Sequence, residues 1–229
     1  MNIAIVIAGG SGNRFGANIP KQYVTVNNEP VILYTLRIFQ DAKCIDKIVV
    51  VCTEQWNEYI KTLKSTHHLC KLTGTVKSGD TRFYSIYNGI LFCCSQYEKQ
   101  DILTIHDAVR PCITEELLED NITMAKVHGA ALATAPCFDT MFISSNGKFA
   151  EGIYPREKLF KGQTPVSMQA ELAAECYQKA VDCQLYTDSP AALLLQLGKK
   201  VALSKGSQQN IKITTKEDLK TLSWYNPKF

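Results

Sequence analysis

A short apolar run followed at once by a cluster of glycines constrains what this chain can fold into. Residues 3–8 read I-A-I-V-I-A, and Gly9, Gly10, Gly12 and Gly16 follow. An uninterrupted apolar run of this length is typical of a parallel strand that is buried on both faces. Glycines after such a strand let the backbone turn sharply and bring bare N–H groups against a ligand. The sequence therefore predicts a buried strand that leads into a binding turn.

Two basic residues accompany this turn. Arg14 lies among the glycines, and Lys21 follows in the segment P-K-Q. Guanidinium and ammonium groups supply the positive charge that a run of phosphates needs. Plain connecting turns are also rich in glycine, but the spacing G-G-x-G-x-R with P-K-Q downstream is far more restrictive. The pattern favours a site for nucleotide phosphates.

Two familiar phosphate-binding loops do not fit the sequence. A P-loop ends in Gly-Lys-Ser/Thr, and the chain has no such triplet. The dinucleotide fingerprint needs a third glycine shortly after Gly12 and an acid that closes the second strand. Phe15 stands near the required glycine position, and Glu29 precedes a helical pattern instead of closing a strand. A pyridine-nucleotide dehydrogenase is therefore disfavoured.

Composition and charge exclude some classes of protein. The chain has 229 residues and a net charge of +3, which is too balanced for a protein that coats nucleic acid. No apolar run reaches the length of a bilayer span, and no cationic leader precedes the first strand. We expect a cytoplasmic protein that binds neither nucleic acid nor membrane.

The cysteines give no sign of a disulfide framework or a zinc site. There are nine, an odd number, and no C-x-x-C pair occurs among them. Several lie within apolar patterns, where a free thiol behaves as a small hydrophobic side chain. We expect reduced, structural cysteines, and the sequence leaves any metal ligands unknown.

The apolar periodicity alternates between strand and helix along the first 135 residues. Further strands are expected at 47–52, 72–76, 101–105 and 130–135, and helices at 30–42, 54–65, 81–94 and from Thr114 onward. This alternation predicts an α/β fold, a Rossmann-like and mostly parallel sheet with helices on both faces. Ligands bind beyond the carboxyl ends of such strands, where residues 9–16, 78–82 and 106–111 should meet.

The alternation of strand and helix patterns ends at residue 138. Residues 138–156 read as two strands joined around Asn146-Gly147, a strong hairpin signal. Such a hairpin does not easily extend a parallel sheet, so we expect a projecting arm that serves as a dimer contact. The segment G-Q-T-P returns the chain to the body, and helices at 168–181 and 188–197, a strand at 201–204 and a helix at 216–224 follow. The whole chain, 1–229, reads as a single domain, with 138–156 as its projecting arm.

An ordered set of short motifs resembles one enzyme family over nearly the whole chain. The motifs are A-G-G-S-G-N-R, P-K-Q, S-G-D-T-R-F-Y-S, H-D-A-V-R-P, G-Q-T-P, T-D and N-I-K-I-T-T-K-E-D-L. Together they resemble the cytidylyltransferases that act on sugar-alcohol phosphates, either 2-C-methyl-D-erythritol 4-phosphate or ribitol 5-phosphate. The resemblance implies transfer of CMP from CTP to a polyol phosphate, release of pyrophosphate, dependence on Mg²⁺ or another divalent cation, and a homodimer.

The resemblance also implies roles for individual residues. It assigns nucleotide binding to Ala8, Gly9, Gly10, Gly12, Gly79, Asp80, Ser85, Asp107 and Ala108, catalysis to Arg14, Lys21 and Lys212, and binding of the acceptor to Arg110, Thr140, Arg156, Thr164 and Thr187. Thr140 and Arg156 lie on the arm and match positions that reach the neighbouring subunit.

Several alternatives stay open at this point. Arg110 could simply pair with Asp107, Arg156 could be a surface charge, and a lone histidine at a strand end, His106, is more typical of structure than of catalysis. A non-catalytic nucleotide-binding regulator would share the glycine turn. The methylerythritol enzymes usually carry a tryptophan before A-Q-T-P-Q, where this chain reads L-F-K-G-Q-T-P-V, and Gly162 is closer to the ribitol-type branch. The acceptor could therefore be either polyol phosphate, or another phosphate or phosphonate.

Overall fold

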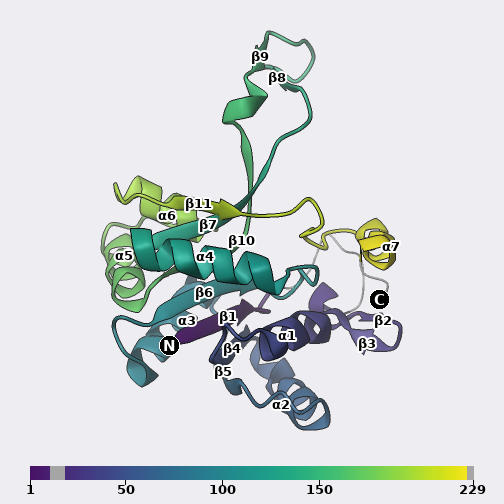
Figure 1. Ribbon diagram of the computed structural model, residues 1–229, viewed down its shortest axis with the longest axis vertical. Coiled ribbons are helices and arrows are strands. Elements are labelled where there is room, and N and C mark those ends of the chain that lie inside the picture. The colour runs from purple at the N-terminus through teal and green to yellow at the C-terminus, as the bar shows by residue number, and fades with distance from the viewer. Residues whose placement is uncertain (11–18, 226–229) are drawn as a thin grey trace.

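A seven-stranded sheet forms the centre of the structure, with the strand order β11-β7-β10-β6-β1-β4-β5 (Figure 1). The computed structural model describes residues 1–10 and 19–225, and their side chains as far as residue 220. The strands of the sheet are β1 (Asn2–Ile7), β4 (Lys47–Cys52), β5 (Leu72–Lys77), β6 (Ile102–Asp107), β7 (Ala130–Pro136), β10 (Phe160–Gln169) and β11 (Ala202–Lys205). All neighbouring strands pair in parallel except β10, which is antiparallel to β6 and β7.

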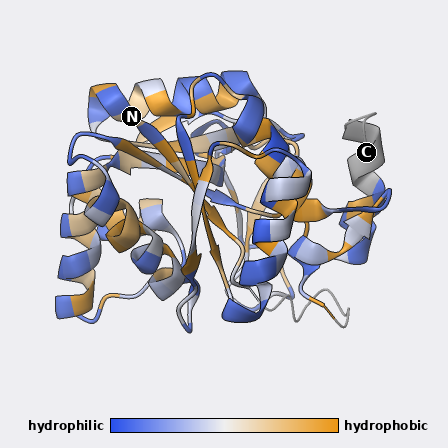
Figure 2. Ribbon diagram, turned by 90° about the horizontal axis from the view of Figure 1, so that it is seen from below, coloured by the Kyte–Doolittle hydropathy of each residue, from blue (hydrophilic) through white to orange (hydrophobic). Residues whose placement is uncertain are grey.

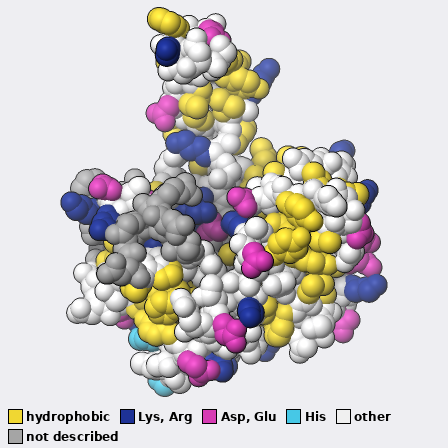
Figure 3. Space-filling model, turned by 180° about the vertical axis from the view of Figure 1, so that it is seen from behind, with side chains coloured by type: hydrophobic (Ala, Val, Ile, Leu, Met, Phe, Trp, Pro, Cys, Tyr) yellow, Lys and Arg dark blue, Asp and Glu magenta, His cyan; other side chains and the backbone are white. Residues whose placement is uncertain are grey.

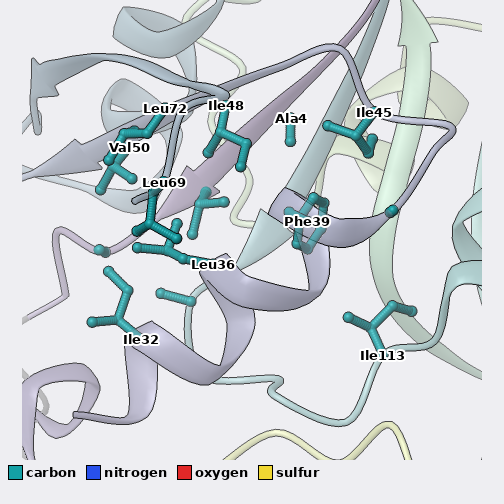
Figure 4. Close-up of a cluster of buried hydrophobic side chains, with 14 of the residues drawn as sticks. Ala4, Ile32, Leu36, Phe39, Ile45, Ile48, Val50, Leu69, Leu72 and Ile113 are labelled. Carbon is teal, nitrogen blue, oxygen red and sulfur yellow. The ribbon is translucent and has the colours of Figure 1, made fainter. Parts of the chain in front are cut away.

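Helices cover both faces of the sheet because successive strand residues point to opposite sides. On one face, Ala4, Val6 and Ile48 share a buried cluster with residues of α1 (Val31–Asp41), α2 (Asn57–Thr66) and α4 (Glu115–His128) (Figure 4). On the other face, Ile3, Ile5 and Val49 pack with α3 (Arg82–Gln96), α5 (Ala170–Asp182) and α6 (Pro190–Gln196). Figure 2 shows hydrophobic residues gathered between these layers. The last helix is α7 (Lys216–Tyr225).

The predicted fold class is confirmed, together with most of its elements. The strand at 47–52 has the predicted bounds, and the other predicted strands and helices of the body agree within a few residues. Thr81 and Thr114 cap α3 and α4, because each side-chain oxygen accepts a hydrogen bond from a backbone N–H three residues on. Pro30 is the N-cap of α1 and not its first residue, and the helix predicted at 54–65 begins as a 3-10 turn, Glu54–Trp56.

The antiparallel strand β10 was not predicted. The chain was expected to return through G-Q-T-P and enter a helix at 168, but residues 160–169 instead insert between β6 and β7. Gly162 and Pro165 lie inside this segment, and they favour the prediction of a loop because proline is rare in central strands. The ladder accommodates Pro165 through a register shift between Gly162 and Val166.

A small hairpin after the glycine turn was also missed. It consists of β2 (Thr25–Val26) and β3 (Glu29–Pro30), which pair antiparallel directly before α1. Asn27 and Asn28 form its turn with φ angles of 49° and 65°, a conformation that asparagine tolerates better than most residues.

Residues 138–156 form an arm that stands away from the sheet (Figure 1). Its strands, β8 (Met141–Ile143) and β9 (Gly152–Tyr154), pair antiparallel as predicted. They are shorter than expected, and residues 144–151 join them as a wide loop instead of a tight turn. Within this loop, the Asn146 side chain accepts hydrogen bonds from the N–H groups of Lys148 and Phe149. Figure 3 shows hydrophobic side chains along the surface of this arm.

Across the described residues, none of the helices combines the length and the apolar character needed to cross a lipid bilayer.

The close approach of α3 to the sheet gives a test of the packing. A Cβ atom at Gly89 would lie 2.8 Å from Ile5 Cγ2 and 3.0 Å from Val51 Cγ2. We expect Gly89→Val to lower the free energy of unfolding by about 2 kcal/mol, because the added methyl groups would push the helix away from β1 and β4. Urea denaturation measures the change. In the control, Leu91→Val on the exposed side of α3, the change should stay within about 0.5 kcal/mol, and equal losses would contradict the packing.

Candidate active site

A cavity of about 580 Å³ opens at the carboxyl ends of the parallel strands. It lies where β1, β4, β5 and β6 end, and the described parts of the three segments predicted to meet at this edge, residues 9–10, 78–82 and 106–111, lie at or beside it. The residues that line it are Ile7, Ala8, Gly9, Gly10, Lys21, Gln22, Thr53, Ser78, Gly79, Asp80, Thr81, Arg82, Ser85, Asp107, Val109, Lys212 and Thr214. Figure 3 shows basic and acidic side chains side by side in a hollow at the foot of the arm.

Asp107, the last residue of β6, organises the charges of this cavity. One carboxylate oxygen, Oδ1, lies 2.7 Å from Arg82 Nη2, and the other, Oδ2, lies 2.8 Å from Lys212 Nζ. Arg110 Nε lies farther away, 3.7 Å from Oδ2. The Asp107 side chain is only 7% exposed, so water screens these pairs weakly. One buried carboxylate thereby holds basic groups from α3 and from the segment before α7 beside each other.

These neighbours fix the ionisation of Asp107. Burial alone would raise its pKa, but the charges of Arg82 and Lys212 and their hydrogen bonds outweigh burial and hold the pKa well below its usual range. Asp107 is therefore an anion near neutral pH. The stability that it contributes is present above the pKa of an unfolded aspartate, about 4, and is lost as the pH falls through the depressed folded value.

Arg82 is a site residue that the sequence-based assignment left out. It lies in the first turn of α3, lines the cavity, and donates a second hydrogen bond to the backbone oxygen of Asp188. It thus links the end of β6 to the loop that precedes α6. The motif S-G-D-T-R did contain the signal, because a basic residue in a capped first turn beside Asp80 lies at the binding edge of the sheet.

Lys21 and Gln22 reach the cavity from the 3-10 turn Lys21–Tyr23. Lys21 Nζ donates to the backbone oxygen of Ile213, 2.7 Å away, which places this ammonium group next to the segment that carries Lys212. Gln22 Nε2 donates to the backbone oxygens of Ala8 and Gly10, at 2.7 and 2.9 Å. The P-K-Q segment therefore joins the glycine turn to the chain before α7.

Close packing surrounds the other end of the cavity, where Gly9, Gly79 and Ser85 meet. A Cβ atom at Gly9 would lie 2.4 Å from Ser78 Cβ, and one at Gly79 would lie 2.3 Å from Tyr84 Cβ. Only glycine allows the two loops to approach so closely. Ser85 Oγ accepts a hydrogen bond from the Gly79 N–H at 3.2 Å, which fixes the loop against the first turn of α3.

Three of the predicted site residues lie behind the cavity wall instead of lining it. Ala108 is fully buried, and its backbone N–H and C=O already bond to Ile7 and Thr35. Arg110 donates to the backbone oxygen of Asn210 at 2.7 Å, and Thr164 accepts from the Asp107 N–H at 3.2 Å. The described side chains thus place Ala108, Arg110 and Thr164 as supports of Asp107 and its neighbours.

His106 belongs to the same supporting layer. Its Nε2 lies 3.1 Å from the backbone oxygen of Arg110, which can only accept, so Nε2 carries the proton and Nδ1 accepts from the Thr164 hydroxyl at 3.1 Å. Burial lowers the pKa of His106 to about 4, so the ring is neutral near pH 7. The histidine orients Thr164 and so favours the structural interpretation.

Of the remaining predicted residues, Thr140, Arg156 and Thr187 are described by the structure, and they do not line the cavity of their own chain. Thr140 and Arg156 are exposed on the arm, where Arg156 donates to the backbone oxygen of Phe138. Thr187 lies in the loop between α5 and α6, next to Asp188, which Arg82 contacts. Gly12 and Arg14 lie outside the described residues.

The cavity offers few protein ligands for a metal ion. Asp80 and Asp107 are its carboxylates, and the described residues contain no cluster of three or more histidine, cysteine or acidic side chains that could hold a metal. All nine cysteines are free thiols in the structure. Such a donor set suits a cation that receives most of its oxygen ligands from phosphates and water, as Mg²⁺ does at nucleotide sites.

Comparison with known proteins agrees with this geometry. Residues 2–225 match the family described as IspD, 2-C-methyl-D-erythritol 4-phosphate cytidylyltransferase. An enzyme of that name from Clostridium novyi is 35% identical over 219 residues, covering 95% of this chain and 93% of the relative. A ribitol-5-phosphate cytidylyltransferase from Vibrio parahaemolyticus is 33% identical over 220 residues, covering 95% of this chain and 92% of the relative.

Solved structures show the same fold. The crystal structure of 4-diphosphocytidyl-2C-methyl-D-erythritol synthase from Anaerococcus prevotii has a TM-score of 0.84 at 24% identity, covering 98% of this chain and 95% of the other. The 2-C-methyl-D-erythritol 4-phosphate cytidylyltransferase from Francisella tularensis has a TM-score of 0.78 at 27% identity, covering 99% and 100%. The fold and the cavity thus define a nucleotidyltransferase. The chain belongs to the 2-C-methyl-D-erythritol 4-phosphate cytidylyltransferase family, which confirms the family resemblance.

The buried carboxylate gives a test of the site. We expect Asp107→Asn to lower the free energy of unfolding by about 3 kcal/mol at pH 7, because it leaves Arg82, Lys212 and Arg110 without their shared counter-charge. The difference from the wild type should shrink below about pH 4, because the aspartate of the unfolded chain takes up a proton there while the native carboxylate, whose pKa is depressed, stays charged. Urea denaturation at pH 7 and pH 3 measures both effects.

The control is Asp139→Asn, which removes a carboxylate that is 79% exposed and lies 3.8 Å from Lys161 Nζ. Its effect should be much smaller, since exposed ion pairs add little stability. Equal stability of the wild type and Asp107→Asn at pH 7 would contradict the organising role of Asp107.

Proposed function

We propose that this protein transfers CMP from CTP to a small polyol phosphate and releases pyrophosphate. The observation that supports this most directly is the convergence of Lys21, Arg82 and Lys212 on one cavity beside the glycine turn, around the buried Asp107 carboxylate. A cavity with this charge beside a glycine turn suits the triphosphate of a nucleotide. Family membership supports cytidine as the nucleoside.

The chemistry needs positioning and charge more than acid–base catalysis. The nucleophile is an oxygen of the acceptor phosphate, which is already an anion, so no base has to remove a proton. That oxygen attacks the α-phosphorus of CTP, and the bond to the bridging oxygen breaks as pyrophosphate leaves. The difficulty is to bring two anions together and to stabilise the charge that develops in the transition state, a task for fixed cations.

A divalent cation would complete this charge balance. Members of the family generally depend on one. Mg²⁺ would bind mainly to the phosphates, with Asp80 and Asp107 as the carboxylates within the cavity, and would neutralise charge on the leaving pyrophosphate. The chain itself would bind the remaining phosphate oxygens. The backbone at Gly9 and Gly10 would face the phosphates, and Lys21 and Lys212 would bind their oxygens.

Family membership does not decide which polyol phosphate is the acceptor. The relatives include enzymes named for 2-C-methyl-D-erythritol 4-phosphate and for ribitol 5-phosphate, with 35% and 33% identity. The segment L-F-K-G-Q-T-P-V lacks the tryptophan that usually precedes A-Q-T-P-Q in the methylerythritol branch, and its Gly162 favours ribitol 5-phosphate. A pyrophosphate-release screen that offers CTP, ATP, GTP and UTP with each polyol phosphate tests both substrates. We expect turnover with CTP and with one of the two acceptors; CTP binding without turnover on any of them would favour the non-catalytic regulator.

The arm supports a homodimer. Phe142, Phe149 and Ile153 are 63%, 73% and 63% exposed, which is unusual for such large apolar side chains on a free surface. Thr140 and Arg156 lie on the same arm, away from the cavity of their own chain. Both facts fit an arm that packs on a second copy and brings Thr140 and Arg156 to the acceptor in the neighbouring cavity. A cytoplasmic location fits an enzyme that consumes CTP.

The first test of this function concerns Lys21. We expect Lys21→Ala to reduce pyrophosphate release by about 10²–10³-fold, because it removes a fixed cation from the transition state, while circular dichroism shows the fold intact. Lys99→Ala is the control, since Lys99 is 81% exposed and pairs with Glu171 outside the cavity. Turnover of the Lys21 variant at the wild-type rate would remove Lys21 from the catalytic residues.

The second test asks whether the arm acts in the partner's site. Arg156→Ala should raise the KM for the polyol phosphate more than the KM for CTP, because the arm carries no residue of the nucleotide cavity. Mixing Arg156→Ala with Lys21→Ala protomers should then restore about a quarter of the wild-type activity, since half of the random dimers are mixed and each has one intact site. No recovery in mixtures shown to exchange subunits would contradict an arm that acts across the dimer.

A further inference from the structure

Gln22 is a buried side chain with no charge of its own, but it holds the glycine turn in place. It is 3% exposed and donates both hydrogen bonds of its amide nitrogen to backbone oxygens, those of Ala8 and Gly10. The N–H of Ala8 is bound on its other side to the oxygen of Val51, at 2.7 Å. The start of the turn is thus fixed from two directions, by the sheet and by Gln22.

These contacts determine which way the peptide groups face. In a trans peptide the C=O of one residue and the N–H of the next point in opposite directions. Because the Ala8 oxygen faces Gln22, the N–H of Gly9 faces away from Gln22. Glycine allows either orientation of such a peptide, so the preference has to come from outside the turn. A flipped peptide would present a carbonyl oxygen where an anion is to bind, and the two would repel each other.

The surroundings of Gln22 make it a rigid support. The neighbouring Tyr23 ring stacks on Trp56 with the ring centroids 3.8 Å apart and an angle of 13° between the planes. Lys21, on the other side, is bonded to the backbone oxygen of Ile213. The 3-10 turn is therefore anchored at both ends, and the carboxamide between them has little freedom to follow a moving glycine turn.

We propose that Gln22 is a positioning residue for phosphate binding: its carboxamide holds the Ala8 and Gly10 oxygens away from the phosphates, so that the backbone N–H groups stay available to them. The inference rests on the proposed function in that the phosphates are those of CTP. It concerns the triphosphate only and predicts no effect on recognition of the cytosine or the ribose.

The test compares ligands that differ in their phosphates. In Gln22→Met the side chain keeps nearly its length but loses both donors. We expect its dissociation constants for CTP with Mg²⁺ and for inorganic pyrophosphate with Mg²⁺, measured by calorimetry, to rise tenfold or more. The dissociation constant for cytidine, measured by ligand-observed NMR, should change less than twofold. Gln40→Met is the matched control, because Gln40 also bonds to a backbone N–H, that of Lys71, but lies outside the cavity.

Each outcome decides for or against the positioning role. Weaker binding of CTP and pyrophosphate with unchanged cytidine binding supports it. Unchanged binding of all three ligands, or an equal loss for cytidine, overturns it, since an equal loss means general damage to the fold. If Gln22→Met does not fold, Gln22→Asn serves the same comparison, because its shorter amide cannot span both oxygens. A wild type that binds pyrophosphate but not CTP would reject the proposed function while leaving the role of Gln22 intact.

Discussion

The ion pairs of Asp107 are the interaction on which the rest of the site depends. A carboxylate that is 7% exposed would be costly if it stood alone, and it is stable here because Arg82 and Lys212 lie within 2.8 Å of its oxygens. The same pairs draw basic groups from separate parts of the chain to one edge of the sheet. The binding charge is thus in place before any ligand arrives, which is what electrostatic catalysis requires.

A layer of neutral contacts keeps this carboxylate in position. The Asp107 N–H donates to Thr164, the Thr164 hydroxyl donates to His106, and the ring of His106 donates to the backbone oxygen of Arg110. Gln22 holds the backbone at Ala8 and Gly10 through hydrogen bonds, as Thr164 and His106 hold Asp107. In the proposed function, backbone groups and charged side chains face the phosphates, and buried hydrogen-bonding side chains hold those groups in place.

The sequence was enough to predict the fold class, because buried parallel strands leave short apolar runs, such as residues 48–52, that alternate with helical patterns along the chain. It was also enough to predict that Gly9, Asp80 and Asp107 lie at one edge of the sheet. It failed for β10, whose glycine and proline look like a loop and whose place in the sheet depends on the gap between β6 and β7. Arg82 was missed because its importance comes from a contact with Asp107, 25 residues away along the chain.

The most direct test of the account is a crystal structure of the protein with CTP and Mg²⁺. The account predicts that the triphosphate lies between the turn at Gly9 and Gly10 and the side chains of Lys21 and Lys212, with the Asp107 ion pair to Arg82 kept. A triphosphate bound anywhere else, or an Asp107 side chain turned away from both cations in the complex, would contradict it.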